Sequence, residues 1–576
     1  MYIYTLQYNG NDMQKRWVVK PKNNIQKTKK LRDELGVNAV TAELLLNRGI
    51  ETYKQAKHFF RPNLDHLHDP FLMKDMEKAI SRIEQAIGNK EKILIYGDYD
   101  VDGTTAVSVV YSFFRDFHSG LEYYIPDRYL EGYGISIKGI DYAAENGFSL
   151  IIALDCGIKA IEKVKYAKEK GVDFIIGDHH LPGPTIPDAV AVLDPKRADC
   201  LYPYKELSGC GIGFKLIQAF IQKNSMDIQL AYQYLDLVAV SIASDIVPIT
   251  GENRVLTHFG LKKLNTNPNC GLQALINLST NKSGHFSVGD IIFQIGPRIN
   301  AAGRIEHARD AVKLLISKSL PEAEMYSSTV DDQNNVRKGF DLKITEEALD
   351  IIDKDEVLQR RKSTVLFKAD WHKGVIGIVA SRLTEKYYRP TVILTQTNGH
   401  IAGSARSVLG FDLYEALSEC ADLLDQYGGH KYAAGLTMPV ENVPAFQEKF
   451  EAVVQSSIKP EMLQQEVLIE AELNLADIDS KFCRILRQFE PFGPQNEAPI
   501  LLSRNVQGSG YIVGTNHIKI SVRQDNGVPF ECIGFGLGEY IDHINAGHPF
   551  DICYTIEENT WRGKKNLQLN IKAIRY

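Results

Sequence analysis

Short apolar runs alternate with amphipathic segments between residues 91 and 320, and this alternation predicts the architecture of that part of the chain. The runs have the length of strands, and the segments between them have helical periodicity. Strands and helices that alternate in this way form a parallel sheet covered by helices. The clearest strand-like runs are KILIY (92–96), LIIAL (150–154) and DFIIG (173–177). We therefore expect an α/β domain with a parallel sheet over 91–320.

The flanking patterns predict four further parts. Residues 1–90 are expected to form a partly helical lead-in packed on the α/β domain. The segment 321–353 is highly charged, with periodic apolar positions and Gly339 as its one glycine, which predicts a long, exposed connecting helix. A second, smaller α/β domain is expected over 354–458, with strands at STVLFK and PTVILTQ. Several strand-like runs separated by Gly, Asn and Asp predict an all-β barrel over 459–576.

Composition limits the function classes. Of the 576 residues, 44% are hydrophobic and 24% are charged, as in ordinary globular proteins. No apolar run approaches the roughly 18 residues of a membrane helix, and no leader peptide is evident, so we expect a soluble, cytoplasmic protein without a membrane role. The eight cysteines contain no C-x-x-C pair, which argues against a zinc ribbon or a disulfide framework. The net charge of −6 means that any nucleic-acid binding must come from a local basic groove.

Metal-type ligands follow the strand-like runs of the first α/β domain. The residues are Asp98, Asp100 and Asp102 after the first run, Asp155 after the second, and Asp178, His179 and His180 after the third. Carboxyl ends of parallel strands meet at one edge of a sheet, so we expect these loops to converge. Asp245, at the end of a predicted buried helix, is a further candidate. Oxygen ligands with a few imidazoles suit Mn²⁺ or Mg²⁺, and this many carboxylates can hold two ions.

The acidic segment Asp98-x-Asp100-x-Asp102-Gly103 also opens like a calcium-binding EF-hand loop. The twelfth position of that loop is Val109 instead of Glu, and a strand-like run precedes the segment where an EF-hand has a helix. A solvated acidic turn would account for this motif alone. It would not account for the ligands that also follow the second and third runs, so a metal site is the favoured interpretation.

The chain resembles the DHH phosphoesterase superfamily and, within it, the single-strand-specific exonucleases. The resemblance rests on motifs that occur in the order of the superfamily: YGDYDVDGTTA (96–106), LDCGI (154–158), GDHH (177–180), SDIVPI (244–249), GPRINAAGRIEHA (296–308), HKGVIGIVASRL (372–383) and GGHKYAAG (428–435). It implies a dinuclear centre of Asp98, Asp100, Asp102, Asp155, His179 and Asp245, with Asp155 as the bridge and His180 near the scissile phosphate. Tyr96 stands where many smaller members carry a metal-binding His, and Asp98 is expected to take over that role.

The same resemblance implies a path for a nucleic-acid strand. Its candidate residues are Arg128, Arg298, Asn300, Arg304, His372, Ser404, Arg406, Gly429, His430 and Trp561, with Ser404 and Arg406 suited to a terminal 5′-phosphate. Alternatives remain for several of them: structural ion pairs for the arginines, a helix C-cap for Gly428 and Gly429, and the barrel core for Trp561. The glycines at 209–213 lack the spacing of a dinucleotide-binding loop and predict a helix start.

The function implied is a 5′→3′ exonuclease that hydrolyses single-stranded DNA to mononucleotides in recombination and repair, using two Mn²⁺ or Mg²⁺ ions. The resemblance also implies an OB-fold for the barrel, a monomer, and a RecQ-type helicase and a single-strand-binding protein as partners. Two alternatives remain: another phosphodiesterase of the superfamily, acting on nanoRNA, cyclic dinucleotides or pyrophosphate, and a non-enzymatic strand-binding scaffold.

Overall fold

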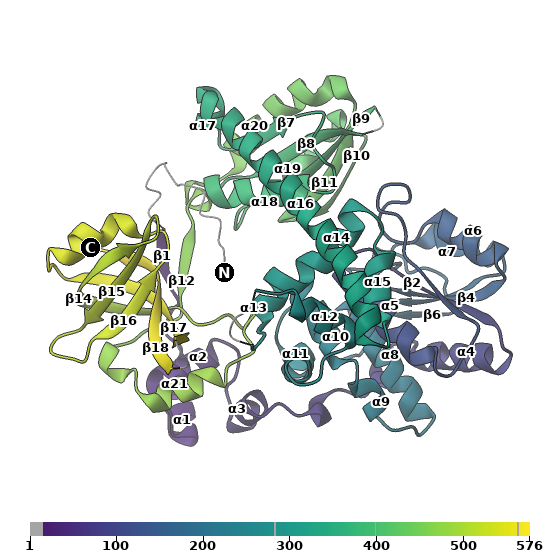
Figure 1. Ribbon diagram of the computed structural model, residues 1–576, viewed down its shortest axis with the longest axis horizontal. Coiled ribbons are helices and arrows are strands. Elements are labelled where there is room, and N and C mark those ends of the chain that lie inside the picture. Colours follow the sequence, from purple (N-terminus) through teal and green to yellow (C-terminus); the bar gives the residue numbers. More distant parts are fainter. Residues whose placement is uncertain (1–14, 281–283, 398, 562–563) are drawn as a thin grey trace. The chain divides into compact units, whose positions relative to one another are not determined.

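The structure, a computed structural model, describes residues 15–280, 284–397, 399–561 and 564–576, and gives the backbone alone for 559–561 and 564–565. The described residues fall into two units. Figure 1 labels helices and strands of both. The first unit contains 19–333 and 469–576, and the second contains 15–18 and 334–468. In the part of the chain that is described, no helix has both the length and the apolar character needed to cross a bilayer.

A parallel five-stranded sheet in the order β3-β2-β4-β5-β6 forms the centre of the first α/β domain. Its strands are β2 (Lys92–Gly97), β3 (Leu121–Tyr124), β4 (Phe148–Leu154), β5 (Asp173–Gly177) and β6 (Ala191–Leu193). Successive strand residues point to opposite faces, so Ile93 and Ile95 enter one core while Leu94 and Tyr96 enter the other. Both faces are covered, which explains why the strands are continuous apolar runs. The predicted parallel sheet is confirmed.

Helices cover the two faces of this sheet unequally. The smaller core contains α6 (Ile137–Glu145) and α7 (Ile161–Glu169). The larger core is built from α4 (Met76–Gly88), α5 (Val101–Phe114), α8 (Gly209–Lys223), α9 (Gln229–Tyr232), α10 (Leu235–Ser244), α11 (Gly251–Leu264), α12 (Cys270–Asn277), α13 (Val288–Asp290), α14 (Gly296–Ile305) and α15 (Arg309–Ile316). A π-helical turn, η3 (Ile291–Ile295), lies directly before α14. The helix start predicted at 209–213 is confirmed by α8.

The N-terminal lead-in is divided between two cores. The helices α1 (Ile25–Leu35), α2 (Ala39–Leu46) and α3 (Tyr53–Phe60) contribute apolar side chains to the core of the C-terminal barrel, including Leu31, Leu45 and Ala56. The rest of the lead-in, residues 64–73 and α4, packs on the first α/β domain through Leu67, Phe71, Met73 and the buried face of α4. The lead-in is therefore not packed as a whole on that domain, contrary to our expectation, because the apolar side chains of α1–α3 are buried together with those of the barrel.

The long helix α16 (Leu320–Lys354) extends from the first unit into the second. Its presence is confirmed, but the expected exposure is wrong. Near its start, Ala323 and Val330 are buried in the core of the first unit. Near its end, Ala348 and Ile352 are buried in a core of the second unit. Most of its charged residues lie on the remaining faces, although Asp341 is buried and pairs with Arg382 at 2.7 Å.

The second unit contains a five-stranded sheet in the order β10-β11-β9-β8-β7. Its elements are α17 (Glu356–Arg360), β7 (Thr364–Phe367), α18 (Ile376–Tyr387), β8 (Thr391–Thr397), β9 (His400–Arg406), α19 (Leu413–Ser418), β10 (Gln426–His430), β11 (Ala433–Met438) and α20 (Val443–Ser457), with β1 (Arg16–Val19) paired to β12 (Glu466–Ile469) at its boundary. Gly428 and Gly429 lie in β10, in an antiparallel pair with β11. The alternative of a helix C-cap at these glycines is therefore wrong.

The C-terminal region of the first unit is a β-barrel. Its strands are β13 (Ala471–Glu472), β14 (Leu501–Val513), β15 (His517–Arg523), β16 (Phe530–Gly534), β17 (Phe550–Trp561) and β18 (Lys564–Arg575), in the order β13-β14-β15-β16-β18-β17. Pairing of β14 with β17 closes it. The helices α21 (Ser480–Arg487) and α22 (Ile541–Asn545) interrupt the strands. The predicted all-β barrel is confirmed, while the side chain of Trp561 lies outside the described residues.

Candidate metal centre and nucleic-acid path

The proposed ligands lie where the central strands end. Asp98 follows β2, Asp155 follows β4, and His179 comes two residues after β5. The Asp155 amide donates to the carbonyl of Gly177 at 2.8 Å, which extends the ladder by one residue. The chain turns at Asp155 itself, which has a φ of 58°. Aspartate tolerates this left-handed conformation better than most residues, so the turn brings its carboxylate to the edge of the sheet.

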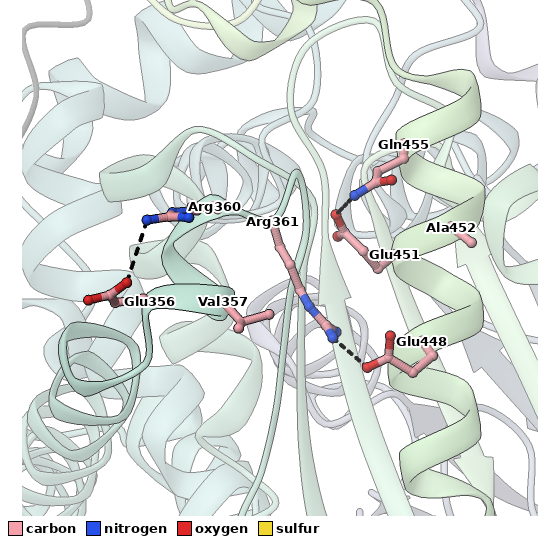
Figure 2. Close-up of a pocket in the computed structure, with 8 residues that line it drawn as sticks. All are labelled: Glu356, Val357, Arg360, Arg361, Glu448, Glu451, Ala452 and Gln455. Atoms are coloured by element: carbon pink, nitrogen blue, oxygen red, sulfur yellow. Dashed lines mark hydrogen bonds and ion pairs between the residues drawn. The ribbon is translucent and has the colours of Figure 1, made fainter.

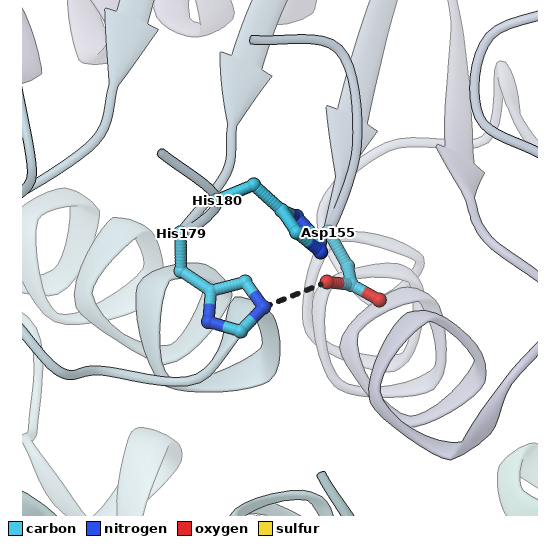
Figure 3. A group of neighbouring side chains, drawn as sticks. All are labelled: Asp155, His179 and His180. Carbon is cyan, nitrogen blue, oxygen red and sulfur yellow. Dashed lines mark ion pairs between the residues drawn. The ribbon is translucent and has the colours of Figure 1, made fainter. Parts of the chain in front are cut away.

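His179 lies among three carboxylates from different elements. Its Nε2 is 3.2 Å from Asp155 Oδ1 (Figure 3). The same atom is 3.6 Å from Asp102 Oδ2 and 3.6 Å from Asp245 Oδ2. Asp102 lies in the first turn of α5, and Asp245 caps the end of α10. The structure thus brings together residues that are far apart in the sequence.

Asp98 and Asp100 complete the acidic cluster. Asp98 is fully buried, its Oδ1 accepts a long hydrogen bond from the Gly134 amide at 3.4 Å, and its Oδ2 has no hydrogen-bond partner among the described residues. Asp100 is the N-cap of α5 and accepts from the Gly103 amide at 3.0 Å. Burial, followed by the charge of Asp100, raises the pKa of Asp98, and burial with the charge of Asp102 raises the pKa of Asp100.

The cluster fits divalent cations. Burial and the neighbouring charge of Asp102 raise the pKa of Asp155 and bring that of Asp245 to about 8. Carboxylates gathered in a buried place repel one another unless positive charge is added. The Oδ2 of Asp98 is a buried acceptor of the kind that a cation satisfies. Carboxylate oxygens with imidazole nitrogen form the ligand set that Mn²⁺ and Mg²⁺ accept.

Asp102 has a second role that we did not predict. Its Oδ2 accepts from the Gly209 amide at 2.6 Å, and its Oδ1 accepts from the Cys210 amide at 2.8 Å and from the Ser241 hydroxyl at 2.6 Å. The carboxylate therefore binds the N-terminus of α8, where partial positive charge stabilises it. The glycine-rich helix start is the one sequence signal for this contact, because it allows a close approach of backbone to side chain.

Gly209 is expected to tolerate no side chain. A Cβ at this position would lie 2.6 Å from the Cβ of Asp155. Gly209→Ala should therefore displace Asp155 or α8, at a cost of about 1–3 kcal/mol in the free energy of unfolding. We expect turnover to fall more than this stability loss explains, since the displaced group is a candidate ligand. Denaturant unfolding and turnover at saturating Mn²⁺ measure the two effects, and normal turnover would contradict the expectation.

His180 has a partner on each ring nitrogen. Its Nδ1 is 2.8 Å from Asp178 Oδ1, and its Nε2 is 3.1 Å from the Tyr133 hydroxyl. Burial alone would lower the pKa of His180, but the hydrogen bond and charge of Asp178 outweigh it and raise that pKa to about 9. Asp178 also accepts from the amides of His179 and Ile158, at 2.7 and 2.9 Å. Asp178 and Tyr133 are thus positioning residues to which the sequence alone assigned no such role.

Tyr96 is no metal ligand in this arrangement. Its side chain is fully buried, and its hydroxyl donates to the Gly134 carbonyl at 2.9 Å and accepts from the Ser136 amide at 3.0 Å. Both contacts hold the turn that also carries Tyr133. The position where smaller superfamily members have a histidine therefore has a structural use in this chain.

The arginines expected on the strand path separate into two groups. The Arg128 guanidinium stacks over the ring of Tyr99 at 4.5 Å. Burial raises the pKa of Tyr99 to about 12, and the positive charges of Arg128 and Arg304 work against this rise. Tyr99 lies between Asp98 and Asp100, so these two arginines are close to the acidic cluster. Asn300 lies between Arg298 and Arg304 on the same helix, α14.

Arg298 belongs to the other group. Its Nε is 2.7 Å from Asp331 Oδ1, and it donates to the carbonyls of Gln294 and Leu278 at 2.6 and 3.1 Å. These contacts use its donors to hold α14 to its surroundings. They favour the alternative of a structural ion pair for Arg298, and its contact with substrate stays a prediction.

The remaining candidates lie in the second unit. The ring of His372 stacks on Phe340 with centroids 4.8 Å apart. Arg406 is half-buried at the end of β9 and donates to the Ser404 hydroxyl at 3.1 Å. Burial lowers the pKa of Arg406, and in the described part of the chain no carboxylate offsets this. A Cβ on Gly377 would lie 2.9 Å from Ser404 Oγ and 3.1 Å from a guanidinium nitrogen of Arg406, so the pair packs directly against the backbone of this glycine.

Gly429 and His430 are exposed residues of β10. A Cβ on Gly429 would lie 2.3 Å from the carbonyl of Ala433, and its φ of 146° is one that side chains rarely adopt. The glycine is therefore required by the β10–β11 hairpin. This accounts for the conformation of the motif and leaves its contact with nucleic acid as an expectation.

A separate hollow of about 440 Å³ lies between α17 and α20 (Figure 2). Its charged groups pair with one another: Arg361 with Glu448, and Arg360 with Glu356. Gln455 donates to Glu451 at 2.8 Å. None of the residues expected from the sequence to act in the site lines it, so it contributes nothing to the candidate chemistry.

Comparisons with known proteins identify the same three domains. Residues 92–242 match the DHH family, N-terminal domain; 361–456 match the DHHA1 domain; and 469–573 match the RecJ OB domain. The last match confirms the expected OB-fold.

Full-length relatives and solved structures agree with these matches. The single-stranded-DNA-specific exonuclease RecJ of Bacillus subtilis is 38% identical over 97% of this chain and 70% of its own. The Escherichia coli protein of the same name is 30% identical over 87% of this chain and 90% of its own. The crystal structure of Thermus thermophilus RecJ in complex with Mn²⁺ has a TM-score of 0.83 and 26% identity, over 97% of this chain and 79% of the other, and a Mg²⁺ complex is also similar. The chain belongs to the RecJ family of single-stranded-DNA-specific exonucleases.

Proposed function

We propose that this protein is a metal-dependent exonuclease that removes mononucleotides from single-stranded DNA in the 5′→3′ direction, in DNA recombination and repair. The observation that carries the proposal is the convergence of Asp102, Asp155 and Asp245 on one nitrogen of His179, at the carboxyl edge of a parallel sheet. The match to all three domains of the family supports the same conclusion.

Two divalent cations, Mn²⁺ or Mg²⁺, are proposed to occupy the acidic cluster. The proposed ligands are Asp98, Asp100, Asp102, Asp155, His179 and Asp245, with Asp155 between the two ions. Candidate ligand atoms of Asp155, His179 and His180, and of Asp102, His179 and Asp245, lie within 4.8 Å of one another. Bound cations of this kind supply an activated water and neutralise charge on a phosphodiester.

His180 is proposed to act on the phosphate instead of holding a cation. Asp178 binds its Nδ1, orients the ring and favours the charged imidazolium. The Nε2 proton points to Tyr133, a half-exposed residue that a phosphate oxygen can replace. A positive group at this place stabilises the negative charge that develops on the phosphate during hydrolysis.

Arg128 and Arg304 are proposed to bind the strand next to the scissile bond. Arg128 stacks on Tyr99, and the positive charges of Arg128 and Arg304 both act to lower the pKa of Tyr99, which burial raises. Since Tyr99 lies in the acidic segment itself, these charges are close to the place where a phosphate would meet the cations. The barrel would add stacking and backbone contacts, since OB-folds bind single strands through aromatic and cationic side chains. The proposal includes a single chain as the working form, and a RecQ-type helicase and a single-strand-binding protein as partners.

The 5′→3′ direction of hydrolysis is tested at Ser404 and Arg406. We propose that these two residues bind a terminal 5′-phosphate. An arginine with a neighbouring hydroxyl suits a terminal phosphate, which carries more charge than an internal diester. Arg406→Ala should reduce the preference for 5′-phosphorylated over 5′-hydroxyl strands by about one to two powers of ten, the value of a charge-assisted contact of roughly 1.5–3 kcal/mol. Rates on matched oligonucleotides measure this preference.

Arg360→Ala is the matched control, because Arg360 is an exposed arginine of the same unit, paired with Glu356. It should leave the preference unchanged. If Arg406→Ala slows both substrates equally, the residue binds the strand in general or supports the fold, and the end pocket lies elsewhere.

The two alternatives have less support. Phosphodiesterases that act on short nucleotides would not require the OB domain matched at residues 469–573. A non-enzymatic scaffold would not require a complete set of candidate ligands that includes a buried, unpartnered carboxylate oxygen.

A further inference from the structure

A loop of the barrel region packs beside the segment that carries Asp245. This loop, residues 489–497, is called the docking loop and connects α21 to β14. The Ile249 amide donates to the Pro494 carbonyl at 2.8 Å. A Cβ on Gly493 would lie 2.5 Å from Ile249 Cγ1, so the two segments approach as closely as a glycine permits. Ile249 is fully buried and lies four residues after Asp245.

Two arginines with mostly buried side chains hold the docking loop in place. Arg254 of α11 donates to the carbonyls of Phe489 at 2.7 Å and Glu490 at 2.8 Å, and its guanidinium lies over the ring of Phe59 at 3.9 Å. Arg48, which follows α2, donates to Asn496 Oδ1 at 2.8 Å and to the Glu497 carbonyl at 2.7 Å. Arginine donors that satisfy several carbonyls at once are costly to lose, so the loop has one well-defined position.

The segment between Asp245 and Ile249 is strained. Ile246 has a φ of 59°, although it is β-branched and 62% exposed. Such a residue strongly disfavours this conformation, which therefore persists only where the surroundings impose it. Asp245 is held at the end of α10 by the hydrogen bond from its amide to the Ser241 carbonyl at 2.9 Å. The other end of the segment is held at Ile249 by the docking loop.

We propose that the docking loop is a positioning element of the metal centre: by fixing Ile249, it keeps the strained segment in the conformation that directs Asp245 toward His179. The inference rests on the proposed role of Asp245 as a ligand and extends it to residues of the barrel region that touch no substrate. The barrel and the cation site are then energetically coupled, so that a change in the docking loop changes the affinity for cations.

Gly493→Ala tests this coupling, because Gly493 has no positive φ and the three atoms nearest to the new methyl group all belong to Ile249. We expect the dissociation constant for Mn²⁺ alone, measured by calorimetry on the whole chain, to rise about tenfold, as overpacking of this size predicts. In an Asp245→Asn background, the same substitution should change the constant much less, since the coupled ligand is already lost. Gly88→Ala is the control, because a Cβ there meets nothing within 4 Å.

Thermal unfolding with a chelator present shows whether each variant is folded. If Gly493→Ala fails to fold, Arg254→Lys is the second variant, since lysine keeps the charge but cannot donate to the separated carbonyls. An unchanged Mn²⁺ constant, or a rise of equal size with and without Asp245, overturns the inference. If Asp245→Asn itself leaves Mn²⁺ binding unchanged, the proposed ligand set is wrong and the inference falls with it.

Discussion

Asp155→Ala is expected to abolish hydrolysis. Asp155 Oδ1 lies 3.2 Å from His179 Nε2, and as the proposed bridge it would help to hold both cations, so its loss should remove both from a productive position. We expect turnover to fall by about three powers of ten or more, since a cation contributes several kcal/mol and each 1.36 kcal/mol is roughly a factor of ten. Turnover at saturating Mn²⁺ and the metal content of the purified protein measure the effect.

The alanine variant also places an unsuited residue at a φ of 58°. Asp155→Asn separates the two effects, because asparagine tolerates this conformation and removes only the charge. Asp188→Ala is the control for a lost carboxylate, since Asp188 is exposed and paired with Lys168. A rate near that of the unmodified protein for both Asp155 variants would show that the bridging assignment is wrong.

His180→Ala should lower turnover by about two powers of ten or more while metal binding stays nearly unchanged. The reason is that both ring nitrogens of His180 already have partners, Asp178 and Tyr133, whereas His179 is the imidazole among the carboxylates. A positioned acid or a charged group at the reacting phosphate typically contributes an effect of this size. Single-turnover rates and Mn²⁺ calorimetry on the same sample measure the two quantities separately.

An equal loss of metal and turnover in His180→Ala would make His180 a cation ligand. Asp178→Asn gives an independent test of the same assignment. It removes the charge that raises the pKa of His180, so it should also lower turnover, and unchanged turnover in that variant would contradict a charged His180 at the phosphate.

The sequence alone predicted the order of the domains and the place of the acidic cluster. Strand residues such as Ile93, Ile152 and Ile175 are buried in a sheet that is covered on both faces, so they form continuous apolar runs that can be recognised without a structure. The ligands follow these runs directly, and parallel strands must end at one edge. Apolar runs and the ligands that follow them are set by residues adjacent in the chain, so they can be recognised from the sequence.

Contacts between distant residues decided the rest. Arg298 and Arg304 belong to the same sequence motif, and the sequence does not distinguish their roles. In the folded chain, Arg298 pairs with Asp331, whereas Arg304 lies near Tyr99. The capping of α8 by Asp102 and the packing of α1–α3 into the barrel likewise join segments far apart along the chain. The sequence by itself thus determined which elements form and which chemistry follows each strand. Only the tertiary structure decided which groups each charged side chain meets, because a charged side chain is satisfied by groups close to it in space, wherever they occur in the chain.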